Sequence, residues 1–515
     1  MVSIQIDKKS DKPLYVQIRD RIRQAVQDGE LSPGDKLPAV SAFAKEVGVT
    51  QATIRRAMED LKEQGLTHCH VGRGTFISEP SFSESPGADS GGAADRTPSM
   101  VLSASGRQIR PAQAARQFRQ RVSKGLCDLM SVASQPGVID FSKGVPDPAL
   151  LEEGVFEEMM AAAMTEGVQG YADYGDLRGM PALRETLAER YQEKGVRISP
   201  EQVLITNGAQ QGACIAARDA AEKGRQVIIK APGFQGLVDA FVGNGNWVET
   251  VIGDRGWDVA EQLERFTGAS SHLLSICPDF HNPVGEDVMA EQRRKIAAWA
   301  EKNKGIILSD EVYQDLRFEG PAPEPMINLL GQKQTIVISS LSKPLMPGLR
   351  LGWMISSRRR IAEFARIKRL MAQTGPPLMQ SVALQYFLSG AYDRHLERVR
   401  NIYLKRRDTM LTCLEQLMPE GVEWTRPSGG FALWVTLPRG YSSVALLISV
   451  LDKGVNLVPG PVFDMDQRFV NAFRLSCAWT GRDRIAEGME VLADAVKELL
   501  RQPPGDSGLS GLGHF

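Results

Sequence analysis

The chain has 515 residues, of which 42% are hydrophobic and 24% are charged, and its formal net charge is −1. This composition is typical of globular proteins and excludes a chain that is disordered throughout, and the length suffices for about two to four domains. The six cysteines form no Cys-x-x-Cys pair, which indicates neither a zinc site nor a disulfide framework. The cysteine pattern favours a reducing, cytoplasmic compartment, and we expect no bound metal. No signal core and no run of roughly 18 apolar residues is present, so we expect a protein that is neither secreted nor inserted into a membrane.

The N-terminal segment predicts three helices and a hairpin. Apolar residues recur at helical spacing over residues 14–26 and the pattern stops at Gly29. Two short helices are expected over residues 40–47 and 51–64, which is the spacing of a helix-turn-helix. Residues 66–71 and 75–77 then flank Gly72-Arg73-Gly74, which predicts a hairpin wing with a basic tip.

In a helix-turn-helix, the second helix enters the major groove with its N-terminal residues, and a basic wing tip can reach a minor groove. The candidate DNA-binding residues are therefore Thr50, Gln51, Thr53, Arg55, Arg56 and Arg73. The alternative is a small protein-interaction module with exposed arginines. The wing favours the DNA-binding interpretation.

Over residues 12–78 the chain resembles the GntR family of winged-helix regulators. The matching stretches are Pro13-Leu14-Tyr15-Val16-Gln17-Ile18, Leu31-Ser32-Pro33-Gly34-Asp35-Lys36-Leu37-Pro38, Gly48-Val49-Thr50 and Gly72-Arg73-Gly74-Thr75-Phe76. Ser41 and Gln51 depart from this pattern, because many relatives carry arginine there. Losing two cations is expected to weaken phosphate binding or to shift the operator sequence.

A linker is expected over residues 79–130. Half of the 28 residues from Glu79 to Gly106 are Ser, Pro or Gly, a composition that buries too little apolar surface to fold alone. Seven basic residues and no acidic one follow between Arg96 and Lys124. This stretch is either a solvated helix or a second phosphate-contacting surface.

The stretch Ser340-Leu341-Ser342-Lys343 follows an apolar strand at residues 335–338, and Arg350 comes seven residues after the lysine. A lysine at a strand end, flanked by hydroxyls and followed by an arginine, can hold an aldehyde covalently and clamp its phosphate. Taken alone, the lysine is more simply a solvated surface charge.

Several other residues support a pyridoxal phosphate site. Asp310 ends an apolar strand, where a carboxylate suits a protonated pyridine nitrogen, and Tyr313 and Asn282 can bond the ring phenolate oxygen. Taken alone, Asp310 is more simply a capping Asp and Asn282 is more simply part of an Asn-Pro turn. The strand-turn-helix at residues 203–212 presents the amides of Ala209 and Gln210 to a phosphate, and Phe234 could stack on a cofactor ring or lie in the core.

From about Val138 to Leu500 the chain resembles the fold-type I aminotransferases of the aminoadipate and kynurenine-type branch. The resemblance implies an α/β fold with a mainly parallel sheet flanked by helices and a smaller C-terminal α+β part. It implies pyridoxal 5′-phosphate as cofactor, with Lys343, Asp310 and Tyr313 catalytic. The expected cofactor contacts are Lys343, Asp310, Tyr313, Asn282, Phe234, Ala209, Gln210, Ser340, Ser342, Arg350 and, from the neighbouring subunit of a homodimer, Tyr174. The expected substrate contacts are Arg474 with the α-carboxylate, Asn282, and Gly144 in an arm that covers the substrate.

A winged helix joined to an aminotransferase-like domain resembles the MocR-type subfamily of GntR regulators. The expected organisation is a DNA-binding domain at 1–78, a linker at 79–130, a pyridoxal phosphate-binding domain at 131–502 and a disordered tail at 503–515. The expected function is a regulator that binds an operator and senses an amino acid, amine, 2-oxo acid or the cofactor itself. The alternative is an active aminotransferase with an appended DNA-binding domain, which the complete set of catalytic residue types favours.

Overall fold

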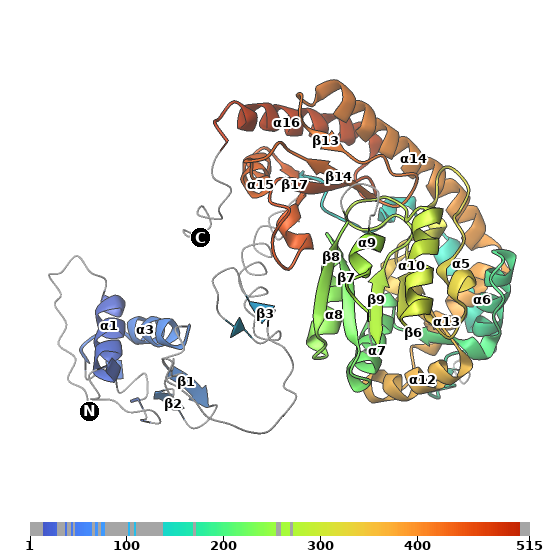
Figure 1. The fold of residues 1–515 in the computed structure, drawn as a ribbon, viewed down its shortest axis with the longest axis horizontal. Coiled ribbons are helices and arrows are strands. Elements are labelled where there is room, and N and C mark those ends of the chain that lie inside the picture. The colour runs from blue at the N-terminus through green and yellow to red at the C-terminus, as the bar shows by residue number, and fades with distance from the viewer. Residues whose placement is uncertain are drawn as a thin grey trace. The chain divides into compact units, whose positions relative to one another are not determined.

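A computed structural model describes residues 14–27, 35, 37–38, 43–44, 47–63, 67–70, 74–77, 101–102, 108–109, 137–167, 171–253, 259–267 and 271–504. The chain divides into two compact units, Met1–Pro98 and Ser99–Phe515, and the division falls inside the segment expected to be a linker. Figure 1 shows the helices and strands of both units in chain order.

The N-terminal unit contains the predicted first and third helices and the predicted hairpin. Its elements are α1 (Leu14–Gln27), α3 (Gln51–Glu63), β1 (Thr67–His70) and β2 (Gly74–Ile77). The two strands pair antiparallel, with Thr67 opposite Ile77 and His70 opposite Gly74, so the hairpin is confirmed. Of the expected second helix, Phe43, Ala44 and Val47 are described and are helical. Gly29, Ser41 and Arg73 lie outside the described residues.

A small apolar core joins α1 to α3. Ile18, Ile22, Ile54 and Leu61 are almost fully buried and pack together, because apolar residues three and four positions apart form one face of each helix.

Replacing Ile54 with alanine is expected to lower the free energy of unfolding of this unit by about 2–5 kcal/mol, because the change removes buried methyl groups and leaves a cavity. Denaturant unfolding followed by circular dichroism measures the change. Gln51→Ala is the matched control on the same helix, because the Gln51 side chain is exposed and its loss is expected to cost less than about 0.5 kcal/mol. Equal destabilisation by the two variants would contradict this core.

The second unit is built on a seven-stranded sheet with the strand order β6-β12-β11-β10-β9-β7-β8. The strands from β11 to β8 run parallel, whereas β12 is antiparallel to both of its neighbours, so the expected mainly parallel sheet is confirmed. The strands are β6 (Val203–Thr206), β7 (Gln226–Ala231), β8 (Val248–Ile252), β9 (His272–Ile276), β10 (Ile306–Asp310), β11 (Thr335–Ser340) and β12 (Gly352–Ile355).

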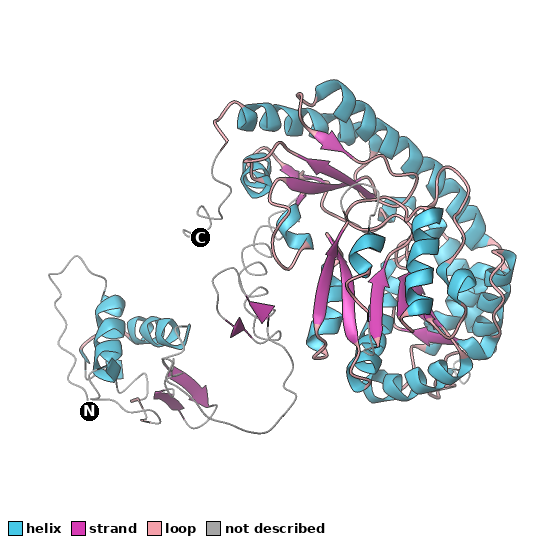
Figure 2. Cartoon of the chain, in the orientation of Figure 1, coloured by secondary structure: helices cyan, strands magenta, loops and turns pink. Residues whose placement is uncertain are grey.

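Helices cover both faces of this sheet (Figure 2). Because side chains alternate along a strand, Ile306 and Leu308 of β10 face the helices α7, α8 and α12, while Ile307 faces α9, α10 and α11. The helices α5, α6 and α13 pack on Val203 and Ile205 of β6. The bounds are α5 (Val155–Ala163), α6 (Pro181–Glu193), α7 (Ala209–Glu222), α8 (Gln235–Gly243), α9 (Val259–Leu263), α10 (Ala290–Lys302), α11 (Met326–Leu330), α12 (Arg358–Ala372) and α13 (Pro377–Leu388).

The C-terminal part is a smaller α+β layer, as expected. A four-stranded antiparallel sheet has the order β13-β14-β17-β16, and a two-stranded parallel sheet joins β15 to β5. Its strands are β5 (Ile139–Asp140), β13 (Glu423–Trp424), β14 (Ala432–Thr436), β15 (Val455–Asn456), β16 (Val458–Pro459) and β17 (Ala472–Ser476). The helices α14 (Ala391–Leu417), α15 (Ser443–Leu451) and α16 (Arg482–Leu500) cover it through one apolar core.

Little of the expected linker is described. Two short antiparallel strands, β3 (Val101–Leu102) and β4 (Gln108–Ile109), lie within it. The rest of the basic stretch from Arg96 to Lys124 and the tail from residue 505 lie outside the described residues. Within the described ranges, no helix has the length and apolar character needed to span a membrane, and no cluster of His, Cys, Asp and Glu has the geometry of a metal site.

Candidate functional site

A cavity of about 240 Å³ lies where β10 and β11 end and α7 begins. The carboxyl ends of parallel strands meet at one edge of a sheet, so Asp310 at the end of β10 and Ser340 at the end of β11 come together there. The sequence-predicted residues that line the cavity are Ala209, Gln210, Phe234, Asn282, Asp310, Tyr313, Ser340, Ser342, Lys343 and Arg350.

The Lys343 amine is the central basic group of the site. Its Nζ donates a hydrogen bond to the carbonyl oxygen of Gly144 at 2.7 Å and lies 5.8 Å from the centre of the Tyr313 ring. Burial and, to a smaller extent, the nearby charge of Arg474 lower the pKa of Lys343 to about 8, while the charge of Asp310 opposes the shift. A fraction of this amine is therefore neutral near pH 7, as a nucleophile requires.

The Asp310 carboxylate lies on the floor of the cavity and is 7% exposed. Burial raises the pKa of Asp310 to about 6, while a hydrogen bond from the Val312 amide at 3.3 Å and the charge of Lys343 oppose the shift. A cationic ring nitrogen beside this carboxylate would favour its ionised form further. Asp310 can therefore act as a counter-ion for a protonated pyridine.

One end of the cavity has the donors of a phosphate site. Gly208, at φ +82°, precedes α7, so the helix begins at the cavity wall with the amides of Ala209 and Gln210. The amino end of a helix of this length favours an anion. Arg350 contacts the turn before this helix, where its Nη2 donates to the carbonyl oxygen of Asn207 at 3.0 Å, and Ser340 and Ser342 line the same cavity.

The Arg474 guanidinium lies at the edge of the site on the buried strand β17. Its Nη1 donates to Oδ1 of Asn282 at 2.9 Å and its Nη2 donates to the carbonyl oxygen of Ser142. Its Nε is buried without an acceptor among the described residues. A Cβ added to Gly144 would lie 3.6 Å from Nη1, so the segment of Ser142 and Gly144 covers both Arg474 and Lys343.

Aromatic side chains complete the cavity wall. Tyr313 is buried with its ring edge-on to Phe431 at 5.7 Å, and burial raises the pKa of its hydroxyl. Phe234 is 43% exposed because it faces the cavity from the start of α8. Tyr174 does not line the cavity and is 68% exposed, so within one chain it stands apart from the other predicted site residues.

Several contacts at the site were not predicted from the sequence. His281 and Cys277 line the cavity, and His281 Nε2 lies 2.7 Å from the carbonyl oxygen of Pro232. Burial and the charge of Lys230 lower the pKa of His281, so the neutral ring donates this bond. His281 could have been predicted from the sequence because it is adjacent to Asn282. The carbonyls of Ser142 and Asn207 could not, because a backbone carbonyl is not marked by the type of side chain.

The residues present fit pyridoxal phosphate. One cavity is surrounded by hydrogen-bond donors for a phosphate, by the Asp310 carboxylate for the pyridine nitrogen and by the Lys343 amine for the aldehyde. The position of the turn that begins α7 depends on glycine, because a Cβ at Gly352 would lie 2.6 Å from the carbonyl carbon of Gly208 and 2.8 Å from the amide nitrogen of Ala209.

The candidate DNA-binding residues lie at the start of α3 in the N-terminal unit. Thr50 caps the helix, because its Oγ1 accepts the Thr53 amide at 3.3 Å and lies 2.9 Å from Thr53 Oγ1. Gln51 and Arg56 are exposed, and the Arg56 guanidinium lies 4.3 Å from the centre of the Tyr15 ring. The side chain of Arg55 and all of Arg73 lie outside the described residues.

Comparison with known proteins assigns families to both units. Residues 136–492 match the family model described as aminotransferase class I and II, and residues 14–77 match the one described as bacterial regulatory proteins, gntR family. A 2-aminoadipate transaminase of Thermus thermophilus is 30% identical over 72% of this chain and 94% of its own length. The uncharacterized HTH-type transcriptional regulator YdfD of Bacillus subtilis is 27% identical over 96% of this chain and 98% of its own length.

Solved structures show the same fold in the second unit. A kynurenine aminotransferase of Pyrococcus horikoshii, in complex with PMP, has a TM-score of 0.70 and 29% sequence identity, and the match covers 74% of this chain and 95% of that one. The chain belongs to the aminotransferase class I and II family and carries a GntR-family regulatory domain ahead of it, which is the architecture of the MocR-type regulators.

Proposed function

We propose that this chain is a homodimeric transcriptional regulator that binds an operator through its winged helix and senses an amino compound through pyridoxal phosphate in the second unit. The observation that carries the proposal is the cavity that joins Lys343 to Asp310 and adjoins Arg474, in a chain that also has a GntR-family domain. A related aminotransferase was solved with PMP, the amino form of this cofactor.

Each residue has a distinct part in this proposal. Bound pyridoxal phosphate supplies an electron sink for the carbon that carries a substrate amine. Lys343 holds the aldehyde carbon of the cofactor and, when its amine is released, can carry a proton between substrate and cofactor carbons. Asp310 keeps the pyridine nitrogen protonated, and Asn282 and Tyr313 bond the ring oxygen. The phosphate binds to Arg350, to the hydroxyls of Ser340 and Ser342 and to the first amides of α7, while Phe234 stacks on the ring.

Arg474 is the proposed receptor for a ligand carboxylate. A guanidinium presents two parallel N–H donors that match a carboxylate. In the structure one donor is bonded to Asn282 and another to the carbonyl of Ser142, so a carboxylate would replace the Ser142 contact. A ligand can alter DNA binding only if it has different affinities for two arrangements of the protein, and this replacement supplies such a difference.

The homodimer is proposed from Tyr174. An exposed tyrosine that stands apart from its own chain's cavity can bind the phosphate in a neighbouring subunit, as the resemblance to fold-type I aminotransferases implies. Sedimentation of Tyr174→Phe alongside the parent protein, with a measurement of cofactor affinity, tests this part of the proposal. A loss of affinity in a protein that is still dimeric supports it.

The deciding experiment is an absorption titration of the cofactor-loaded chain with amino acids, amines and then a 2-oxo acid. A shift of the cofactor band that persists supports a sensor. Bleaching by an amino acid that a 2-oxo acid reverses supports the second candidate, an active aminotransferase. The second candidate is favoured by the presence of all the side chains that we assign to catalysis at one cavity and by the 30% identity to a transaminase.

Capture of added pyridoxal phosphate by the cofactor-free chain is expected to accelerate as the pH rises through about 8. The pKa of Lys343 is lowered to about 8, so its neutral, nucleophilic fraction rises toward one above that pH. Stopped-flow absorbance between pH 6 and 10 measures the rate. A midpoint near 10.5, the value for an unperturbed lysine, would show that the amine is not held in this environment.

The Arg56→Ala variant is expected to weaken binding to all DNA sequences alike and to reduce the slope of log binding constant against log salt by about 1. The reason is that Arg56 is exposed on the proposed recognition helix and can contact a phosphate. Fluorescence anisotropy with labelled duplexes measures the slope. Arg439→Ala removes an exposed arginine from the second unit and is the control. An unchanged slope for Arg56→Ala would show that Arg56 does not contact a DNA phosphate.

A further inference from the structure

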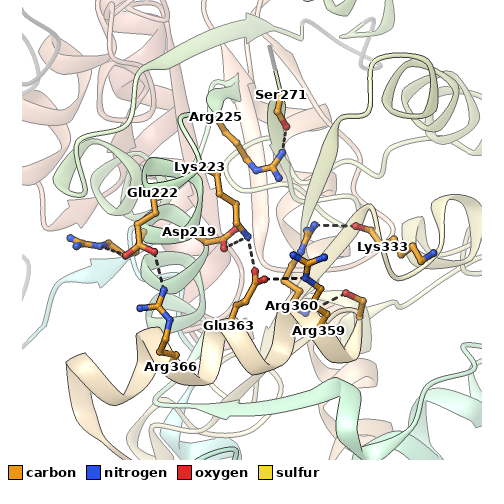
Figure 3. A network of polar contacts seen from close by, with 12 residues as sticks. Asp219, Glu222, Lys223, Arg225, Ser271, Lys333, Arg359, Arg360, Glu363 and Arg366 are labelled. Carbon is orange, nitrogen blue, oxygen red and sulfur yellow. Dashed lines mark hydrogen bonds and ion pairs between the residues drawn. The ribbon is translucent and has the colours of Figure 1, made fainter. Parts of the chain in front are cut away.

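A dense group of charged side chains lies around the end of α7 and along α12 as far as Arg366 (Figure 3). We call its cations the arginine face: Lys223, Arg225, Lys333, Arg359, Arg360 and Arg366. The helix α7 has 14 residues and starts at the cavity, so its far end is about 21 Å away. The arginine face is therefore separate from the candidate pyridoxal phosphate site.

The carboxylates within this group are fewer than the cations. Asp219 pairs with Lys223 at 2.6 Å, and Glu363 pairs with Lys223 at 2.7 Å and with Arg359 at 3.4 Å. Glu222 pairs with Arg366 at 3.1 Å. Glu222 also pairs with Arg218 at 3.0 Å, so the six cations of the arginine face and Arg218 together face three carboxylates, and the group keeps a net positive charge.

Two arginines of the face are also incompletely bonded. Arg225 donates to Ser271 Oγ and Arg360 donates to the carbonyl oxygen of Lys333 at 3.1 Å. The Nε of Arg225 and the Nη1 of Arg360 are buried and have no acceptor among the described residues. Burial lowers the pKa of both groups, and the charge of Arg225 lowers that of Arg360 further. Arg225 and Arg360 thus lie near each other, and each has one N–H donor without an acceptor among the described residues.

The position of the arginines on α12 adds to this excess. Arg358, Arg359 and Arg360 occupy the first turn of the helix, and no acidic residue is present there. The amino end of a helix carries partial positive charge, so three cations at this end repel it, and this repulsion is only partly offset because Glu201 pairs with Arg358 and Glu363 pairs with Arg359, each at 3.4 Å. An anion bound outside the helix would offset this repulsion.

We propose that the arginine face binds the phosphate backbone of DNA. The outer side chains are available for this contact, because Arg359 is 92% exposed and Arg366 is 58% exposed. Arginine and lysine neutralise backbone phosphates without reading the base sequence, so the face adds affinity rather than specificity. DNA is the polyanion that a chain with a GntR-family domain meets, and in this respect the inference rests on the proposed function.

The test compares full-length chains on a random-sequence duplex of about 40 base pairs, because backbone contacts do not depend on sequence. The test variant is Arg359→Ala with Arg366→Ala, which removes two exposed cations and leaves the half-buried pair in place. The matched control is Arg294→Ala with Arg439→Ala, which removes two exposed arginines from elsewhere in the second unit. The measurement is the binding constant at graded salt, with thermal melting and the absorption of bound cofactor as checks on folding.

Two lost phosphate contacts are expected to reduce the slope of log binding constant against log salt by about 1.8, while the control keeps the parent slope. Arg359→Lys with Arg366→Lys keeps both charges and is expected to restore most of the slope. An unchanged slope in the alanine variant overturns the inference while leaving the winged helix as the DNA reader. Competition by inorganic phosphate beyond that of chloride at equal ionic strength assigns the face to a small anion and also overturns it. Failure of the parent chain to bind any duplex overturns the proposed function itself.

Discussion

Replacing Lys343 with alanine is expected to abolish the covalent attachment of pyridoxal phosphate to this chain. Lys343 Nζ is the amine that lines the cavity, and its lowered pKa makes it reactive near neutral pH. Borohydride treatment followed by peptide mass spectrometry is expected to show the cofactor on Lys343 in the parent and nowhere in the variant. Any conversion of a bound amino acid is expected to slow by about 10²–10⁴-fold, because the variant also loses the base that moves the proton.

Lys143→Ala is the matched control for this experiment. Lys143 lies close in sequence to the segment over the cavity, but its amine is placed 3.9 Å from the centre of the Trp479 ring and 3.7 Å from Asp140. Its loss is expected to leave the adduct on Lys343 intact. A borohydride-stable adduct in Lys343→Ala would show that another amine holds the cofactor and would end the assignment of Lys343.

Replacing Arg474 with alanine is expected to weaken the binding of amino acids by about 10- to 100-fold, which corresponds to the loss of charge-assisted hydrogen bonds to a carboxylate. The binding of amines that lack a carboxylate is expected to change little. Absorption titrations with L-leucine against 3-methylbutylamine, and with L-tyrosine against tyramine, measure this difference in one variant.

The amine of each pair controls for general damage to the site, because it reports the state of the cofactor pocket without using Arg474. Arg474→Lys adds a second comparison, since lysine keeps the charge but lacks the two parallel donors. It is expected to recover only part of the amino-acid affinity. Equal losses for the acid and the amine would indicate that Arg474 supports the fold of β17 and does not select carboxylates.

The strands and helices with strong local patterns were predictable from the sequence. Residues 203–206 form the strand of the strand-turn-helix predicted at residues 203–212, because a short apolar run is followed at once by a glycine turn. The strand β12, in contrast, was not predicted, although it lies between β6 and β11 in the sheet. Its place there depends on long-range pairing, which a local apolar pattern does not encode.

The residues of the candidate pyridoxal phosphate site were predictable where a side chain with a defined role toward the cofactor lies at or just after the end of a predicted strand. Asp310, Ser340 and Lys343 meet this condition and line one cavity. Tyr174 lies away from that cavity, and its proposed use requires a second chain that one sequence pattern cannot position. The backbone carbonyls that contact the site could not be predicted from the sequence, because every residue has a carbonyl. The contacts of Gly144 with Lys343 and of Ser142 with Arg474 depend on the folded path of the chain alone.

The carbonyls of Gly144 and Ser142 occupy hydrogen-bond donors of Lys343 and Arg474 that the cofactor and a ligand would otherwise use. On this proposal, a carboxylate that takes the Nη2 donor of Arg474 displaces the Ser142 carbonyl, so the free energy with which the segment docks is lost from the affinity of such a ligand. By thermodynamic reciprocity, a bound ligand loosens the segment to the same extent. The segment is tied at Asp147 to Arg406 of α14 by an ion pair of 2.7 Å. On this proposal, occupancy of the site is linked through that ion pair to the longest described helix of the C-terminal part, which packs against α16.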